Sequence, residues 1–359
     1  MLDQVLKHLE ALVSFDTRNP PRAIGTGGIF DYLRGQLPDF RIEVRDHGAG
    51  AVSFLAVRGE PKRLFNVHLD TVPDSPAWTA DPHKLRVTED RAIGLGACDI
   101  KGAAACLVAA ANATKGDAAF LFTTDEEAND PRCIDAFLKT DHGFQEVLVS
   151  EPTRCEAVLA HRGIASVQMR FQGRAGHASG AEAMQANALH QAIRWGADAL
   201  AMVEAESHQR FGGLTGLRFN IGRIEGGIKA NMIAPSADLR FGFRPLPSQD
   251  MDVLHDYFHG LAPEGTSYEP LFRGPSLPAG DVSDAETRRL AARDLADELG
   301  LPIGNAVDFW TEASLFSAAG LTAIVFGPGD IAQAHTADEW VALDQLAEAA
   351  TVFQRLMER

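Results

Sequence analysis

His68 and Asp70 are the first residues of this sequence whose types and spacing suggest chemistry. They end an apolar stretch that begins at Leu64 and stops before Pro73, which is typical of a strand buried in an α/β sheet. Residues two apart on a strand point to the same face, so the imidazole and the carboxylate would be neighbours. This spacing suits a metal-ligating histidine whose other ring nitrogen is held by a carboxylate. A buried histidine–aspartate pair without a ligand is the alternative that this spacing alone leaves open.

Two further apolar segments end in acidic residues. Ala118–Phe122 leads into Asp125–Glu127, and Val147–Val149 leads into Glu151. If these segments are neighbouring parallel strands, their carboxyl ends meet at one edge of the sheet. Several carboxylates crowded there repel one another unless a cation neutralises them. The three strand ends together therefore predict a cation site.

The rest of the chain supplies the elements that must position these groups. We expect a hairpin over 85–93, a helix over 285–299, a strand over 323–326 and a terminal helix over 338–357. Between them the pattern changes to the order β-α-β-β-α-β of a ferredoxin-like unit, over residues 164–171, 183–204, 217–224, 237–243, 250–261 and 267–272. The sequence thus predicts a split α/β domain, 1–162 and 273–359, with a central mixed, mostly parallel sheet, interrupted by an inserted α+β domain, 163–272.

Composition narrows the class of protein. The 359 residues carry 33 basic and 49 acidic side chains, a formal net charge of −16, which argues against nucleic acid or an anionic membrane as a partner. The four cysteines (Cys98, Cys106, Cys133, Cys155) form no C-x-x-C pair, which favours a reducing compartment. The first residues predict an amphipathic helix rather than a signal peptide, so we expect a cytoplasmic protein.

A glycine-rich turn at 94–102 precedes an alanine-rich helix and contains Asp99. By position it could hold a phosphate, but it matches neither the P-loop pattern nor the dinucleotide fingerprint. The sequence therefore disfavours a nucleotide-dependent enzyme.

Taken together, these motifs resemble the M20 family of metal-dependent aminoacylases and peptidases. The likeness covers nearly the whole chain in order, and its set of motifs is specific where each one alone is weak. The motifs are His68-x-Asp70, Gly96–Gly102 around Asp99, Asp125–Glu127, Ser150–Thr153, Gly173–Ser179 around His177, and Ala334-His335. The resemblance implies a zinc-peptidase-like catalytic domain and an inserted domain that acts as a lid and joins two subunits in a homodimer.

The resemblance also assigns a metal centre residue by residue. Asp99 would bridge two divalent ions, with His68 and Glu151 completing one site and Glu127 and His335 the other. Histidine and carboxylate ligands without a thiolate suit Zn²⁺ or Co²⁺, one or two ions per subunit. Glu126 would be the general base, and Asp70 would orient His68.

The resemblance places further residues around the substrate. His177 would reach the partner subunit's active site and stabilise the oxyanion, while Asn231 and Arg244 would hold the substrate carboxylate. An ordinary charge at a strand end is the alternative for Arg244. We expect the backbone N–H groups of Gly327 and Gly329 to face the same carboxylate, and Glu312 to lie near the substrate side chain. A plain acidic residue at a helix start is the alternative for Glu312.

The segments Thr311–Ala313 and Gly327–His335 resemble the acetylornithine deacetylase branch of the family. The expected reaction is metal-dependent removal of the acetyl group of an N-acetyl amino acid, N-acetyl-L-citrulline, in arginine biosynthesis. N-acetyl-L-ornithine, a dipeptide and succinyl-diaminopimelate stay open as alternative substrates. A non-catalytic binding protein is disfavoured because Glu126 and every expected ligand are present.

Overall fold

The computed structural model describes residues 1–358, and these divide into two compact units. Unit 1 comprises Met1–Leu159, Thr287–Gly304 and the chain from Thr311 onward. Unit 2 comprises Ala160–Glu286 and Asn305–Trp310. Unit 1 is therefore discontinuous in the sequence: the chain leaves it near residue 160 and returns to it near residue 287. The boundaries at 163 and 272 stay a prediction.

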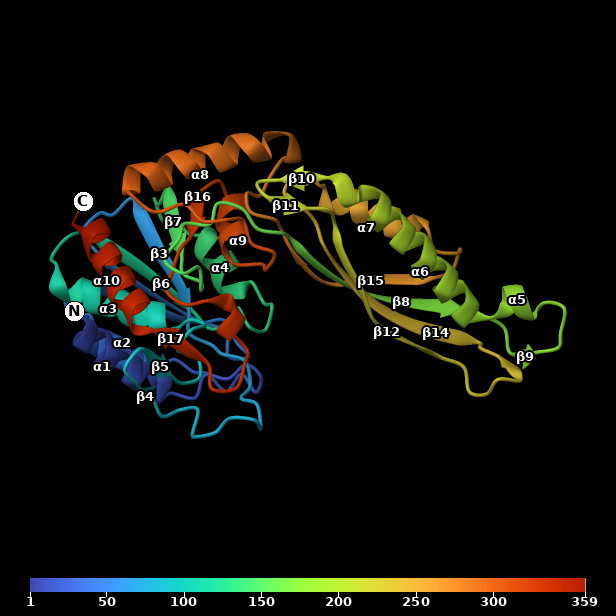
Figure 1. Cartoon of the computed structure of the whole chain (residues 1–359), viewed down its shortest axis with the longest axis horizontal. Helices are drawn as coiled ribbons and strands as arrows, with labels where there is room; N and C mark the ends of the chain where they lie inside the picture. Colours follow the sequence, from blue (N-terminus) through green and yellow to red (C-terminus); the bar gives the residue numbers. More distant parts are fainter. Residues whose placement is uncertain (359) are drawn as a thin grey trace. The chain divides into compact units, whose positions relative to one another are not determined.

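Unit 1 is built on a six-stranded sheet in the order β1-β2-β6-β3-β7-β16 (Figure 1). The pairs β6-β3, β3-β7 and β7-β16 are parallel, whereas β1-β2 and β2-β6 are antiparallel, so the sheet is mixed and mostly parallel. The strands are β1 (Arg41–Asp46), β2 (Val52–Arg58), β3 (Arg63–His68), β6 (Ala118–Thr123), β7 (Glu146–Val149) and β16 (Thr322–Val325). Every residue of β6 is buried, as a near-continuous apolar strand covered on both faces requires.

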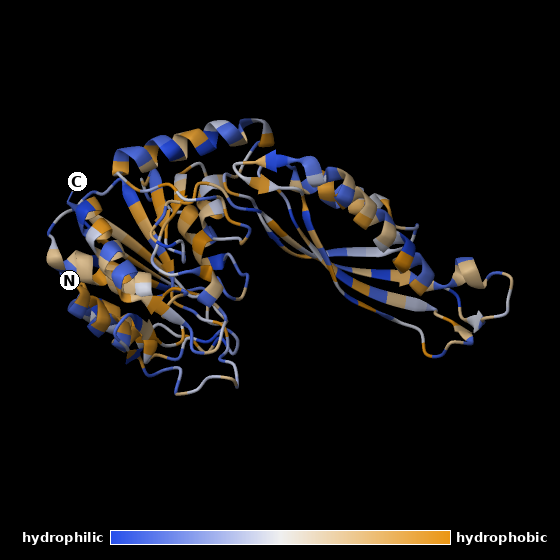
Figure 2. Cartoon of the chain, in the orientation of Figure 1, coloured by the Kyte–Doolittle hydropathy of each residue, from blue (hydrophilic) through white to orange (hydrophobic). Residues whose placement is uncertain are grey.

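Helices cover both faces of this sheet, with α1, α2, α3 and α10 on one side and α4 and α9 on the other (Figure 1). Their apolar faces and the strands form one core, and Figure 2 shows the hydrophobic residues concentrated there. In α3, Gly102 packs so closely that a Cβ would lie 2.4 Å from the carbonyl oxygen of Ala97, so no larger residue fits. The helices are α1 (Leu2–Val13), α2 (Ile29–Gln36), α3 (Lys101–Ala113), α4 (Arg132–Leu138), α8 (Ala285–Leu299), α9 (Ala313–Ala318) and α10 (Leu343–Met357).

A small three-stranded sheet explains why the terminal helix starts later than predicted. The expected hairpin is present as β4 (Arg86–Val87) and β5 (Arg91–Ile93), and β17 (Trp340–Ala342) pairs with β5. The helix α10 therefore begins at Leu343 and not at Asp338, because Asp338 lies in a turn and Trp340–Ala342 form β17. The pairing is reinforced by Arg91, whose guanidinium lies 4.2 Å from the ring centre of Trp340.

Unit 2 contains an antiparallel four-stranded sheet in the order β12-β14-β8-β15. Its elements follow the order β8 (Ile164–Gln172), α6 (Ala188–Ala205), β12 (Arg218–Gly226), β14 (Ser236–Arg244), α7 (Met251–Gly260) and β15 (Ser267–Gly274). This is the ferredoxin-like order that the sequence predicted. Its separate core is centred on Trp195, whose indole N–H donates to the carbonyl of Phe258.

The helix expected over 183–204 is divided in two. A short helix, α5 (Ala183–Ala186), ends at Asn187, whose side chain accepts hydrogen bonds from the N–H groups of Leu189 and His190 and so caps α6. Two short pairs, β9 (Gly176–His177) with β13 (Met232–Ile233) and β10 (Arg210–Phe211) with β11 (Leu214–Thr215), complete the unit. Within residues 1–358, none of the helices has the length and apolar character needed to cross a membrane.

Candidate metal centre

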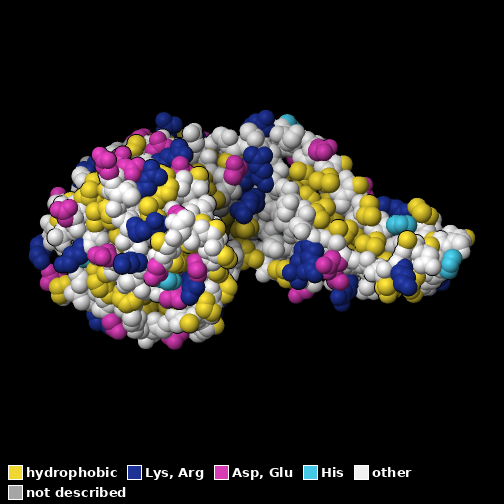
Figure 3. All heavy atoms as spheres, turned by 60° about the horizontal axis from the view of Figure 1, so that its bottom comes forward, with side chains coloured by type: hydrophobic (Ala, Val, Ile, Leu, Met, Phe, Trp, Pro, Cys, Tyr) yellow, Lys and Arg dark blue, Asp and Glu magenta, His cyan; other side chains and the backbone are white. Residues whose placement is uncertain are grey.

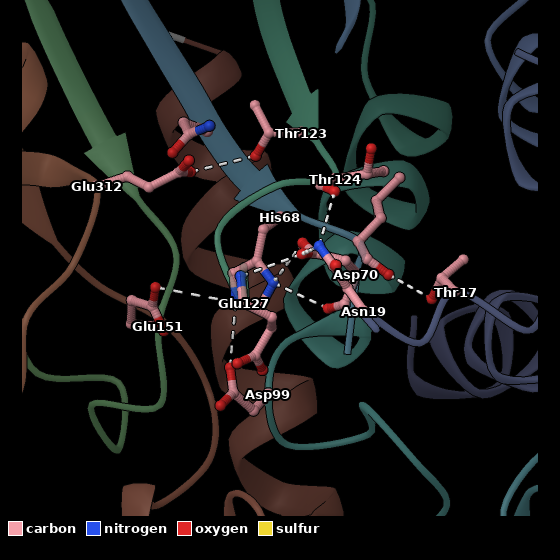
Figure 4. A network of polar contacts seen from close by, with 12 residues as sticks. Thr17, Asn19, His68, Asp70, Asp99, Thr123, Thr124, Glu127, Glu151 and Glu312 are labelled. Atoms are coloured by element: carbon pink, nitrogen blue, oxygen red, sulfur yellow. Dashed lines mark hydrogen bonds and ion pairs between the residues drawn. The ribbon is translucent and has the colours of Figure 1, made fainter. Parts of the chain in front are cut away.

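Three neighbouring parallel strands of unit 1 deliver the acidic and imidazole groups to one edge of the sheet. β3 ends at His68, β6 ends just before Asp125–Glu127, and β7 ends just before Glu151. Because β6, β3 and β7 lie side by side, these strand ends converge. Figure 4 shows His68, Asp99, Glu127 and Glu151 pointing toward one another.

Asp99 lies at the centre of the cluster. Its Oδ1 is 3.2 Å from Nε2 of His68, and its Oδ2 is 3.4 Å from Nε2 of His335. Glu151 approaches His68 at 4.0 Å, and Glu127 approaches His335 at 3.2 Å. The five residues thus form two groups of potential ligands that share Asp99, each with its ligand atoms within 4.8 Å of one another.

The electrostatics of the cluster are those of a site that attracts positive charge. Hydrogen bonds to Asp99 and Glu127 raise the pKa of His335 to about 10. Burial raises the pKa of Glu151 well above its usual range, and the nearby Asp99 and Glu312 carboxylates add to that shift. Buried carboxylates this close together repel one another, and bound protons or cations reduce that repulsion.

The donor set fits divalent cations. Two imidazoles and three carboxylates converge without a thiolate, which is the chemistry that Zn²⁺ and Co²⁺ accept. The adjacent Cys98 is turned away, since its Sγ donates to the carbonyl of Asp330. The side chain of His335 is 55% exposed, so one side of the centre is open.

Glu126 precedes Glu127 and is not one of the five grouped residues. Burial raises its pKa well above the usual range, and the Glu127 and Glu151 carboxylates add to that effect, whereas His68 opposes it. A carboxylate with a raised pKa beside these potential ligands is suited to accept a proton.

His68 is oriented from its other ring nitrogen. Its Nδ1 lies 3.0 Å from the backbone oxygen of Asp70 and 3.4 Å from Oδ1 of the same residue. Asp70 Oδ2 accepts hydrogen bonds from the side-chain amide of Asn19, at 2.9 Å, and from the N–H of Glu127, at 3.1 Å. The sequence did not single out Asn19, because this residue lies in a turn-rich N-terminal loop that contains no motif.

Glu312 is almost completely buried in unit 1. It is only 2% exposed, and its Oε2 accepts a hydrogen bond from the hydroxyl of Thr123, next to the metal-ligand cluster (Figure 4). Burial raises its pKa to about 8, and the Asp125 carboxylate contributes. Its contact with a substrate side chain stays a prediction.

The backbone N–H groups of Gly327 and Gly329 both have partners within the protein, and their role toward a substrate carboxylate stays a prediction. The N–H of Gly327 donates to the hydroxyl of Thr153, and that of Gly329 donates to the side-chain oxygen of Gln345. Both donors expected to face a substrate carboxylate are therefore engaged within the protein.

The remaining expected residues lie in unit 2. His177 and Asn231 are neighbours, because β9 pairs with β13 and the N–H of Ala178 donates to the carbonyl of Asn231. The strand β14 begins at Ser236, shortly after β13, and Arg244 is its last residue. Its nine residues span roughly 26 Å from the first to the last Cα. One chain therefore brings His177 and Asn231 together but holds Arg244 apart from them.

Comparison with known proteins gives this fold and site a family. Residues 64–359 match the model of Peptidase family M20/M25/M40. The chain therefore belongs to this family of hydrolases, as the sequence motifs predicted.

Individual relatives agree with this assignment. The chain is 70% identical, over 99% of its length and 98% of the relative's, to an N-acetyl-L-citrulline deacetylase of Xanthomonas campestris pv. campestris. It is 30% identical to an acetylornithine deacetylase of Myxococcus xanthus, over 86% of this chain and 84% of that one. The fold is similar to the aminopeptidase PepT of Bacillus cereus (19% identity, TM-score 0.72, covering 100% and 98% of the chains). It is also similar to the YXEP protein of Bacillus subtilis, described as a dinuclear metal-binding peptidase from the M20 family (14% identity, TM-score 0.67, covering 99% and 97%).

Proposed function

We propose that this protein hydrolyses the acetyl amide of N-acetyl-L-citrulline, releasing acetate and citrulline in arginine biosynthesis. The observation that carries the reaction type is Asp99, whose two carboxylate oxygens face two histidines, one in each ligand group. The choice of substrate rests on the relative that is 70% identical over 99% of the chain. Four free thiols support a reducing cytoplasm as its location.

The metal ligands in this proposal are His68, Asp99 and Glu151 for one ion and Asp99, Glu127 and His335 for the other. Divalent cations held by these residues, Zn²⁺ or Co²⁺, would polarise the amide carbonyl as Lewis acids and would lower the pKa of the attacking water. Asp70 keeps the Nδ1 proton of His68 in place, so that Nε2 presents its lone pair to the centre.

Glu126 performs the proton transfers. It takes a proton from the attacking water as the new C–O bond forms, and it gives that proton to the leaving nitrogen as the C–N bond breaks. Its environment supports this role, because a carboxylate whose pKa is raised by burial is a stronger base than an exposed one.

We further propose that the active enzyme is a homodimer joined through unit 2. The separation of Arg244 from His177 and Asn231 supports this, because the three cannot surround one substrate within a single chain. Unit 2 also exposes large apolar side chains, among them Ile193 and Leu200 on α6 and Ile224 on the edge strand β12. Figure 3 shows hydrophobic side chains gathered on the surface of this unit, as an interface would require. In the dimer, His177 of the partner subunit donates a hydrogen bond to the developing oxyanion.

The test is the initial rate of acetate release from N-acetyl-L-citrulline and N-acetyl-L-ornithine, each with Zn²⁺, with Co²⁺ and with a chelator. We expect a metal-dependent rate that strongly favours citrulline. A preference for N-acetyl-L-ornithine, whose side chain ends in an ammonium instead of a neutral ureido group, would show that the proposed substrate is wrong. If neither compound is hydrolysed in a metal-dependent way, the proposed reaction is wrong.

A further inference from the structure

Glu339 connects two loops that carry potential metal ligands. It lies four residues after His335, just before β17, and it is only 2% exposed. Its side chain reaches the loop that ends at Asp99, 240 residues earlier in the sequence. No motif in the sequence singles it out.

The Glu339 carboxylate accepts three backbone hydrogen bonds from that loop. Its Oε1 accepts from the N–H of Cys98 at 2.8 Å and from the N–H of Asp99 at 2.9 Å, and its Oε2 accepts from the N–H of Gly96 at 3.0 Å. The Glu339 backbone oxygen also accepts from the N–H of Gly94 at 3.1 Å. Glu339 thus accepts hydrogen bonds from four N–H groups of the loop that precedes α3.

Only a carboxylate suits this arrangement. Three converging N–H donors need an acceptor with at least three lone pairs in the right directions and no hydrogen of its own. Gly96 adopts φ +78°, a left-handed conformation that turns its N–H toward Glu339, and a Cβ there would lie 2.7 Å from Thr71. The loop is therefore shaped around the carboxylate.

We propose that Glu339 is a positioning residue of the metal centre, which holds the backbone of Asp99 where its two carboxylate oxygens face His68 and His335. Asp99 carries the only side chain common to both ligand groups among the described residues, so a shift of its backbone changes both groups at once. Ligand geometry must hold within about 0.5 Å for a site to work. The inference rests on the proposed function in taking Asp99 as the shared ligand.

The experiment compares Co²⁺ binding to the full-length wild-type protein, Glu339→Gln and Glu339→Ala. Binding is followed by calorimetry and by the visible absorption bands of the bound Co²⁺, which report ligand geometry independently of activity. We expect affinity to fall about 10- to 100-fold in Glu339→Gln and further in Glu339→Ala, with altered bands in both. Glutamine keeps the side-chain volume and one acceptor, but its NH₂ group meets the N–H of Gly96.

The matched control is Glu146→Gln. Glu146 is a partly buried carboxylate at the start of β7, paired with Arg63 at 2.9 Å and at the far end of that strand from Glu151. This variant should lose stability without any change in Co²⁺ affinity or absorption.

Folded Glu339 variants that bind Co²⁺ with wild-type affinity and bands, and merely melt at a lower temperature, would overturn the inference. Because Glu339→Gln preserves volume, the result does not depend on Glu339→Ala folding. Wild-type protein that binds no Co²⁺ would overturn both the inference and the proposed function. Wild-type protein that binds Co²⁺ but releases no acetate would overturn the proposed function alone.

Discussion

Asn19 donates its side-chain amide to the carboxylate of Asp70 at 2.9 Å, although 51 residues separate the two in the sequence. Asn19 is 1% exposed and Asp70 is fully buried. Further hydrogen bonds hold the N-terminal loop against the end of β3. The N–H of Asn19 donates to the carbonyl of Thr71, and the hydroxyl of Thr17 donates to the carbonyl of Leu69. The loop therefore supports the group that orients His68.

Asn19→Ala should impair turnover more than substrate binding. Asp70 loses the hydrogen bond from Asn19, so His68 is held less firmly, and kcat should fall about tenfold with little change in KM. Loss of a buried bond to a charged group should also lower the free energy of unfolding by about 1.5–3 kcal/mol. Steady-state kinetics and denaturant unfolding measure both effects.

The control is Asn112→Ala, which replaces an exposed asparagine of α3 in the same unit. It should leave kcat unchanged. If Asn19→Ala lowers stability but keeps wild-type kcat, the positioning role is wrong.

Glu126→Gln should separate catalysis from metal binding. The amide cannot accept the proton of the attacking water, so kcat should fall by about 10²- to 10⁴-fold while metal content and melting temperature stay unchanged. The neighbouring Glu127→Gln should instead lose bound metal, because Glu127 lies 3.2 Å from His335 in the ligand cluster. Elemental analysis together with kinetics distinguishes the two, and an active Glu126→Gln enzyme would rule out this base.

Action of His177 across a dimer predicts complementation between two inactive variants. In a mixed dimer of His177→Ala and Glu126→Gln, one site has an intact Glu126 and receives the intact partner histidine. Co-expression with random pairing should give about a quarter of the wild-type rate, because half of the dimers are mixed and each has one working site of two. If the co-expressed pool is as inactive as its parents, His177 does not act across the interface.

His255 should make unit 2 less stable in mild acid. Burial, with a contribution from Arg273, lowers the pKa of His255, whereas Asp252 and Asp256 oppose the shift, and its Nδ1 lies 2.7 Å from the hydroxyl of Tyr268. The folded chain thus binds a proton less readily than the unfolded chain, where histidine titrates near pH 6.5. The stabilising contribution is complete above that pH and declines as the pH falls through about 6.5 toward the lower folded pKa.

Melting temperatures at pH 7.5 and 5.5 measure this dependence. Wild-type protein should lose more stability between the two than His255→Gln, which does not titrate. His208→Gln, which replaces an exposed histidine of the same unit, should behave as wild type. Equal pH dependence in wild-type protein and His255→Gln would contradict the prediction.

Much of the fold of unit 1 could be predicted because its signals are local. Apolar strands followed by polar residues predicted that His68, Asp125–Glu127 and Glu151 lie at one edge of the sheet, and the order β-α-β-β-α-β predicted the four-stranded sheet of unit 2. The helix break at Asn187 was not predicted, because the apolar period continues across it while the cap is a hydrogen bond from the side chain to two backbone N–H groups. The late start of α10 was missed because it depends on pairing between β17 and β5, which are far apart in the sequence.

The sequence by itself determined which side chains could do chemistry and which elements carry them, since residue type and periodicity are written locally along the chain. Tertiary structure alone decided that Asn19 supports Asp70, that Glu339 supports the loop of Asp99, and that the N–H groups of Gly327 and Gly329 are engaged. It also separated Arg244 from His177 within one chain. The physical reason is that these relationships are hydrogen bonds and registers between distant segments, which leave no pattern in either segment alone.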